Sequence, residues 1–197
     1  MSEQPSKQLV VVGGPNGSGK STFADEYVAL YQLRYLGADA IAAELAPNDP
    51  FSVRVEAGKQ FVRRLKAALQ AGESLVIEST LAGKGLDKHL LQAKTFGYQI
   101  SLVFVTLDSP DLSIARIRER VANGGHHVPD EDVIRRFDRA RNQFWHTFRH
   151  LADDWQLFSN TGEGFTLIAL GQSDDYEVTD ITELNEFTAS LEQTHEH

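Results

Sequence analysis

The sequence predicts an α/β protein of three layers, in which a mainly parallel five-stranded sheet carries helices on both faces. Short apolar runs alternate with longer stretches of helical periodicity along most of the 197 residues. The first run, Leu9 to Val12, has no polar interruption, which is typical of a parallel strand covered on both faces. A glycine-rich turn follows it directly, and a helical pattern follows the turn.

The composition limits the classes of function. The net charge of −9 argues against a nucleic-acid or anionic-membrane surface, since both require a basic face. Absence of cysteine excludes disulfides, thiol catalysis and cysteine metal sites, and fits a reducing compartment. No stretch is long and apolar enough to span a bilayer, and the first eight residues do not resemble a signal peptide. We therefore expect a cytoplasmic protein with a small-molecule ligand, no nucleic-acid partner and no membrane partner.

The turn after the first strand fits the phosphate-binding loop G-x-x-x-x-G-K-[ST], between a buried strand and a helix as that motif requires. Its glycines let successive N–H groups point at a phosphate, and the following helix adds its positive dipole end. Lys20 is expected to reach the β- and γ-phosphates of ATP, and Ser21 to ligate Mg²⁺. The predicted nucleotide-binding residues of this loop are Gly14, Pro15, Asn16, Gly17, Ser18, Gly19, Lys20, Ser21 and Thr22.

A second strand, Arg34 to Leu36, delivers Asp39 to the edge of the sheet where ligands of parallel α/β proteins lie. We predict that Asp39 is a catalytic base. The alternative is an N-cap for a helix from Ala40 to Ala46.

The next helix runs from Ser52, as its predicted cap, to about Gln70, with Val55, Val62, Leu65 and Leu69 on its core side. Gly58 shares that register, which predicts close helix packing or a nearby ligand, and Gly58 and Lys59 are candidate substrate contacts.

The third strand, Ser74 to Ile77, brings Glu78, Ser79 and Thr80 to the same edge. Glu78 is predicted to hold Mg²⁺ through water or to orient the substrate, and Ser79 and Thr80 to contact the substrate. An ordinary strand-end turn is the open alternative for all three.

The stretch from about 110 to 150 is expected to form an arginine-rich lid of two helices joined by a glycine turn. It holds eight of the twelve arginines of the chain and no lysine. Arginines on such a lid can hold the phosphoryl group that is transferred, while a solvated, salt-bridged helix pair is the alternative. Arg120 and Arg136 are the predicted catalytic arginines, with Arg116 and Arg135 as near-equal candidates. The paired histidines His126 and His127 in the turn do not predict a zinc site.

The rest of the chain predicts a sheet edge and an acidic tail. A fifth strand, Trp155 to Phe158, and a run from Phe165 to Leu170 form an expected hairpin, in whose turn Asn160 is a candidate adenine contact. We expect a kinase-like domain over residues 1–171 and an acidic tail over 172–197. Asp180 and Glu183 predict the start of a terminal helix that packs on the domain or is appended to it. The tail is either a docking site for a protein partner, such as an antitoxin, or a solvated terminus.

Read together, these motifs resemble the zeta toxin family of P-loop kinases over roughly residues 9–160. The resemblance depends on the phosphate-binding loop, Asp39 with Ile41-Ala42, Glu78 to Leu81, and the motifs from Arg120 to Arg136 that include Gly-Gly-His-His-Val-Pro. It implies the P-loop kinase fold, Asp39 as base, Lys20 and the lid arginines as phosphate clamps, Thr80 as a substrate contact, and a nucleotide sugar such as UDP-N-acetylglucosamine as acceptor. The chain is shorter than the characterised toxins and resembles the small stand-alone branch.

Two other classes remain open. A nucleotide or antibiotic kinase shares the same core, and a non-catalytic nucleotide switch shares the phosphate-binding loop. The lid arginines and Asp39 favour an enzyme, because a switch needs neither.

Overall fold

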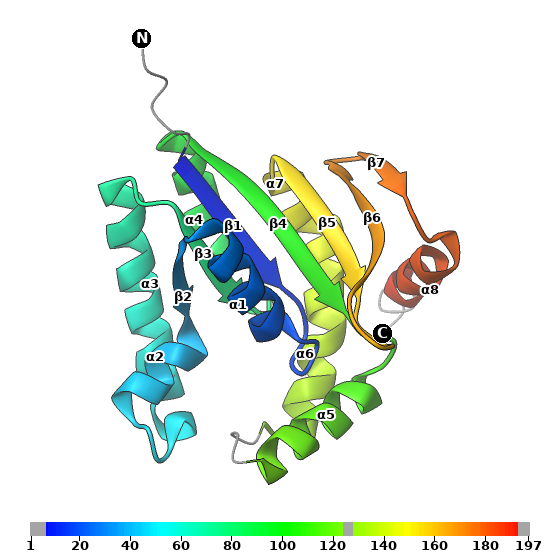
Figure 1. Ribbon diagram of the computed structural model, residues 1–197, viewed down its shortest axis with the longest axis horizontal. Helices are drawn as coiled ribbons and strands as arrows, with labels where there is room; N and C mark the ends of the chain where they lie inside the picture. Colours follow the sequence, from blue (N-terminus) through cyan, green and yellow to red (C-terminus); the bar gives the residue numbers. More distant parts are fainter. Residues whose placement is uncertain (1–6, 124–127, 193–197) are drawn as a thin grey trace.

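The computed structural model describes residues 7–123 and 128–192 of the chain, and Figure 1 shows one central sheet between two helical layers. Five strands are parallel, and two more continue the sheet in antiparallel pairing at one edge. The spatial order is β2-β3-β1-β4-β5-β6-β7. The strands are β1 (Lys7–Gly13), β2 (Arg34–Gly37), β3 (Leu75–Ser79), β4 (Tyr98–Thr106), β5 (Asp154–Ser159), β6 (Thr166–Gln172) and β7 (Asp175–Val178).

The helices cover both faces because the side chains of a buried strand alternate between two apolar layers. Leu9 and Val11 of β1 belong to the larger core, whereas Val10 and Val12 pack with Ala24 on the opposite face. Alone among the labelled helices, α1 lies in front of the strands in Figure 1. The helical elements are α1 (Lys20–Tyr31), α2 (Ala38–Leu45), η1 (Pro50–Val53), α3 (Arg54–Ala71), α4 (Leu86–Thr95), α5 (Pro110–Ala122), α6 (Asp130–Gln143), the π-helical η2 (Phe144–Phe148), α7 (Arg149–Leu151) and α8 (Ile181–Glu192).

This architecture confirms the predicted three-layer fold and its five parallel strands. The predicted edge hairpin is β5 and β6, and β7 is an addition that the sequence pattern did not indicate. All four residues of β7 are exposed, so it lacks the apolar signal of a buried strand.

The acidic tail packs on the rest of the chain. Asp180 caps α8, because its Oδ1 accepts hydrogen bonds from the N–H groups of Thr182 and Glu183 at 3.0 and 3.1 Å. Leu184, Phe187 and Leu191 of α8 are buried in the larger core.

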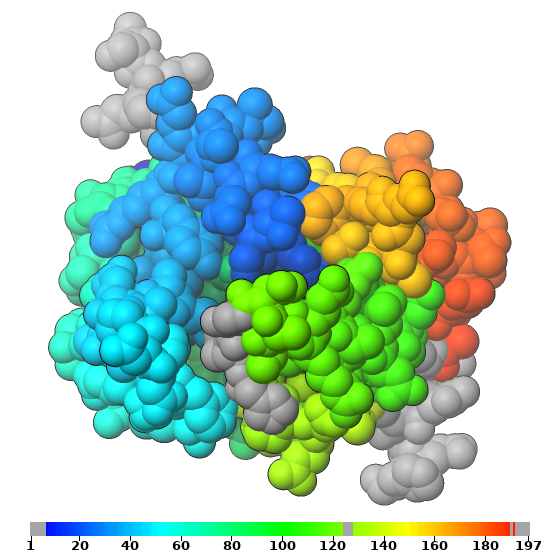
Figure 2. Space-filling model, turned by 60° about the horizontal axis from the view of Figure 1, so that its bottom comes forward, coloured from blue at the N-terminus to red at the C-terminus, as the bar shows by residue number. Residues whose placement is uncertain are grey.

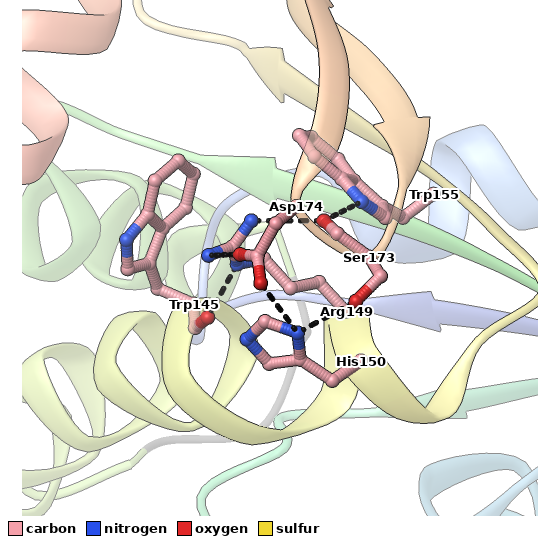
Figure 3. A network of polar contacts seen from close by, with 6 residues as sticks. All are labelled: Trp145, Arg149, His150, Trp155, Ser173 and Asp174. Carbon is pink, nitrogen blue, oxygen red and sulfur yellow. Dashed lines mark hydrogen bonds and ion pairs between the residues drawn. The ribbon is translucent and has the colours of Figure 1, made fainter.

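The second helix of the predicted lid is α6, η2 and α7 in succession, so that a π-helical segment interrupts it. At its end the buried Arg149 ties the turn between β6 and β7 to the helix (Figure 3). Its guanidinium donates to the Ser173 carbonyl at 2.9 Å and to the Asp174 carboxylate at 2.7 Å, and lies 4.2 Å from the ring centroid of Trp145. Arg149 therefore serves the fold, although it falls within the predicted lid.

Two other local expectations were wrong. Asp49, not Ser52, caps the turn before α3, since its carboxylate accepts from the Ser52 N–H. Val55 is 64% exposed, and Ala57, Leu65, Ala68 and Leu69 form the buried side of α3. Among the described residues, no helix is long and apolar enough to cross a membrane.

Candidate active site

Most of the predicted site residues line a cavity of about 590 Å³ at the carboxyl ends of the parallel strands. In Figure 2 this end of the molecule faces the viewer, with the cyan surface of α2 and the start of α3 opposite the green surface of α5. The cavity is lined by Asn16, Gly17, Gly19, Lys20, Ser21, Thr22, Gly37, Ala38, Asp39, Arg54, Phe61, Glu78, Ser79, Thr80, Arg116, Ile117, Arg120 and Arg136.

The phosphate-binding loop has the backbone that its motif requires. Gly14, Gly17 and Gly19 have φ angles of +146°, +76° and +93°, which residues other than glycine rarely adopt. No side chain caps the start of α1, so its first N–H groups remain for an anion. Gly14, Pro15 and Ser18 lie outside the cavity lining and shape the loop behind it.

Lys20 is buried beneath this loop and donates a hydrogen bond from Nζ to the Pro15 carbonyl at 2.8 Å. Burial lowers its pKa, while the charges of Glu78 and Asp39 raise it and that of Arg120 lowers it. These electrostatic interactions show that Lys20 shares one neighbourhood with both carboxylates and with a lid arginine. A phosphate group in the cavity would stabilise the charged form of Lys20.

Asp39 lies in the first turn of α2, one residue into the helix. The N-cap position belongs to Gly37, and no side chain caps this helix, so the alternative assignment of Asp39 as an N-cap was wrong. The short connection from β2 places its carboxylate on the cavity wall. Asp39 is therefore placed where a base could reach a bound hydroxyl.

Glu78 is the last residue but one of β3, the strand next to β1, and contacts the start of α1 through Ser21. Its Oε1 accepts from the Ser21 hydroxyl at 3.2 Å, and its Oε2 accepts from the Tyr35 hydroxyl at 2.7 Å. Burial and the Glu78 charge raise the pKa of Tyr35, so this phenol remains a donor. Tyr35 was not predicted, because nothing local in the sequence links β2 to a carboxylate 43 residues away.

The residues present fit Mg²⁺ and ATP. Side-chain oxygens Asn16 Oδ1 and Ser18 Oγ in the loop are buried and lack a hydrogen-bond partner in the described structure. Ser21 and Glu78 would offer Mg²⁺ the hard oxygen ligands that it takes when phosphates complete its coordination. The described residues contain no cluster of three or more His, Cys, Asp or Glu that would hold a metal alone.

The lid arginines divide by position. Arg116, Arg120 and Arg136 line the cavity, whereas Arg135 bonds to Asp132 and is 62% exposed. Among the near-equal candidates, the structure thus brings Arg116 to the site and leaves Arg135 outside. Helices α5 and α6 pack together through a small core of their own, made of Ile114, Ile117, Val128 and Val133. The turn with His126 and His127 lies outside the described residues.

Besides Gly14, Pro15 and Ser18, three more predicted residues are absent from the lining. Asn160 donates from Nδ2 to the Ser18 carbonyl at 2.9 Å and so supports the loop from behind. Lys59 is exposed, and Gly58 is not packed closely: a Cβ added there would meet no atom within 4 Å. Close helix packing at Gly58 was therefore a wrong explanation.

Sequence reasoning missed Arg54 and Phe61 of α3. Residues 54, 58 and 61 follow the spacing i, i+4, i+7 and share one helix face. The glycine already singled out could have led to both side chains.

A family model described as an AAA domain matches residues 9–144 of the chain. The chain belongs to this AAA domain family. It is 30% identical over 122 residues to an uncharacterized protein of Haemophilus influenzae, over 62% of this chain and 86% of that relative.

Solved structures show the same fold. AvrRxo1-ORF1 in complex with AvrRxo1-ORF2, solved with sulphate ions, matches with a TM-score of 0.74 at 17% identity, over 96% of this chain and 66% of that one. The chain thus spans slightly less than two thirds of that relative. A structure from the PezAT chromosomal toxin-antitoxin system of Streptococcus pneumoniae matches with a TM-score of 0.61 at 14% identity, over 98% and 89% of the two chains. At these identities the likeness confirms the P-loop kinase fold of the zeta toxin resemblance.

Proposed function

We propose that this AAA domain protein is a kinase that transfers the γ-phosphoryl group of ATP to a hydroxyl of a small metabolite. The carrying observation is the joint position of Asp39, Lys20 and three lid arginines around one cavity. A fold neighbour, the AvrRxo1-ORF1:-ORF2 complex, was solved with ATP, which supports ATP as the donor. A nucleotide switch would need Lys20 of the loop but no carboxylate at the position of Asp39.

Phosphoryl transfer depends mainly on positioning and on stabilising charge, and the lining residues suit both tasks. Lys20 and the N–H groups at the start of α1 would hold the β- and γ-phosphates. Arg120 and Arg136 would neutralise charge on the transferred group, and Arg116 would bind the nucleotide phosphates. Ser21 and Glu78 would hold Mg²⁺, which withdraws charge from the phosphate oxygens.

Asp39 would accept the proton of the acceptor hydroxyl as that oxygen bonds to the γ-phosphorus, while the bond from the γ-phosphorus to the bridging oxygen breaks and ADP leaves. Ser79 is the last residue of β3, Thr80 follows it, and both line the same cavity, so their hydroxyls would orient the acceptor. The zeta toxin resemblance makes UDP-N-acetylglucosamine the first acceptor to test, ahead of nucleotides and antibiotics. Gly58 and Lys59 remain candidate acceptor contacts at the rim.

Asp39→Asn tests the proposal. The variant should bind Mg-ATP at least as tightly as the wild type, because a negative charge near the phosphates is removed, and should lose phosphotransfer by several orders of magnitude, because the amide cannot accept the proton. Transfer is measured by mass spectrometry after incubation with Mg-ATP and UDP-N-acetylglucosamine, followed by a metabolite extract. Asp87→Asn, in the first turn of α4 and outside the cavity, is the matched control. Wild-type transfer by Asp39→Asn would refute the role, and ATP binding without transfer to any metabolite would favour the switch.

A protein partner such as an antitoxin is part of the same proposal, since two fold neighbours come from a two-protein complex and from a toxin-antitoxin system. In this chain the apolar side of α8 is buried in its own core, so the acidic tail would offer its charged side instead. Co-expression with a candidate antitoxin should produce a stable complex on size-exclusion chromatography, and separate elution would contradict the proposal.

A further inference from the structure

A second, smaller cavity of about 90 Å³ adjoins the site and has one residue of the phosphate-binding loop, Asn16, in its lining. It shares Asn16, Ala38, Asp39, Arg54 and Arg136 with the main cavity. Of the loop residues only Asn16 reaches it, so the phosphates of a nucleotide held by the loop do not fill it. We call this cavity the recess.

Apolar residues complete the recess. Ala42, Pro50, Phe51 and Val128 come from α2, η1 and the segment before α6. Its volume suits one small group rather than a whole metabolite. The recess therefore offers two arginines against an apolar background, next to the candidate base.

Arg54 is oriented by its own neighbours. Its guanidinium lies 4.1 Å from the ring centroid of Phe51, and its Nη1 donates to the Phe51 carbonyl at 3.3 Å. Stacking on Phe51 fixes the plane of the guanidinium group, which reduces the conformational entropy lost when its other N–H groups bind a ligand.

Arg136 belongs to a different helix, α6. Its Nη2 donates a long hydrogen bond of 3.5 Å to the Asp132 carboxylate. The pKa of Asp132 is lowered by a hydrogen bond from Arg135, and further by the charges of Arg136, Arg135 and Arg54. The two arginines of the recess thus act on one common carboxylate. Two guanidinium groups from separate elements can together donate more hydrogen bonds than the two oxygens of a carboxylate readily accept, which favours the oxygens of a phosphate.

The balance of charged residues around the main cavity also favours an acceptor that bears a phosphate. Five of the residues that line the main cavity are basic (Lys20, Arg54, Arg116, Arg120 and Arg136) and two are acidic (Asp39 and Glu78), although the whole chain carries −9. Arg54 and Arg136 are the two basic residues shared with the recess. Arg136 also has Asp132 beside it and would contact the transferred phosphoryl group, so the charge that a neutral acceptor would leave unmatched in the cavity is mainly that of Arg54.

We propose that the recess binds a phosphate group of the acceptor, so that the substrate of this enzyme is a phosphate-bearing metabolite held between Arg54 and Arg136 with its hydroxyl at Asp39. This inference rests on the proposed kinase function. The body of the acceptor would extend along α3, where the open side of Gly58 leaves room beside the ring of Phe61.

The test uses inorganic phosphate as the probe and the full chain saturated with Mg²⁺ and a non-hydrolysable ATP analogue. With the loop filled, calorimetric titration should still show phosphate binding. Arg54→Gln should weaken this binding at least 10-fold and leave the affinity for the analogue unchanged. Arg63→Gln, an exposed arginine of the same helix outside both cavities, should change neither affinity.

Three results would overturn the inference: phosphate binding only when the analogue is absent, equal phosphate binding by Arg54→Gln, or acetate binding as tight as phosphate binding. Phosphotransfer assays on the same proteins separate this inference from the proposed function. Phosphate binding in the recess without any transfer would refute the kinase and leave the anion site intact. Transfer to a phosphate-free acceptor at full rate would refute the recess and leave the kinase intact.

Discussion

Gly58→Ala should stabilise the protein, because Gly58 lies inside α3 and there is space for a methyl group at its Cα. A Cβ there would meet no atom within 4 Å, and Gly58 is not among the glycines with positive φ. Only the helix propensity then changes, which favours alanine by about 1 kcal/mol. For a domain of this size each kcal/mol raises the melting temperature by about 2–4 °C.

Thermal denaturation followed by circular dichroism measures the shift, with Gly97→Ala as the matched control. An added Cβ at Gly97 also meets nothing within 4 Å, but φ there is +79°. Alanine in that conformation costs about 1 kcal/mol, so the control should melt at a lower temperature. The two sites have equal space for an added Cβ and differ in backbone conformation.

An unchanged or lower melting temperature for Gly58→Ala would refute this reasoning. It would mean that α3 is packed against another group at Gly58, and the room assigned to the acceptor beside Phe61 would be lost with it.

Three further predictions concern buried polar groups. Burial lowers the pKa of Lys20, so the unfolded chain binds more protons between that lowered value and 10.5, and stability should rise with pH across this interval. Lys20→Met should remove that rise, increase the melting temperature of the nucleotide-free protein and abolish its increase with Mg-ATP; an ATP-dependent shift in the variant would contradict the assignment. Arg149→Met should cost about 3 kcal/mol in urea denaturation, because it removes the hydrogen bonds to the Trp145 and Ser173 carbonyls and the stacking on Trp145. Asp174→Asn should cost less than about 1 kcal/mol, because this side chain is 75% exposed and an amide oxygen can still accept from Arg149; equal losses would contradict the argument. Tyr35→Phe removes the donor to Glu78 and should weaken Mg²⁺ binding in the presence of ATP, while ATP affinity in EDTA stays constant; wild-type Mg²⁺ titration by the variant would show that this hydrogen bond has no role.

The parts of the fold that were predictable have local signals. The loop, the five parallel strands and the cap of α8 each depend on residues within a few positions of one another. Strand β7 lacks such a signal, because its exposed residues are ordered by pairing with β6 alone.

The arginines show why the site was only partly predictable. Arg135 and Arg136 are neighbours in the sequence, and only the rotation of α6 against α5 decides which of them faces the cavity. Arg149 was grouped with the lid by composition. In the structure it follows a π-helical segment and is buried against the turn between β6 and β7. Tertiary packing, which composition does not encode, sorts residues of equal charge.

The position of Asp39 gives the strongest argument about what the cavity does. A site that only bound a nucleotide would gain from positive charge at the phosphates and would lose affinity from a carboxylate nearby. Asp39 is close enough to Lys20 to raise its pKa, so its own charge acts against an incoming phosphate. Such a cost is expected where the carboxylate performs a step that binding alone does not need. The position of Asp39, which lines both the main cavity and the recess, therefore favours a reaction between ATP and a second ligand over the binding of a nucleotide alone.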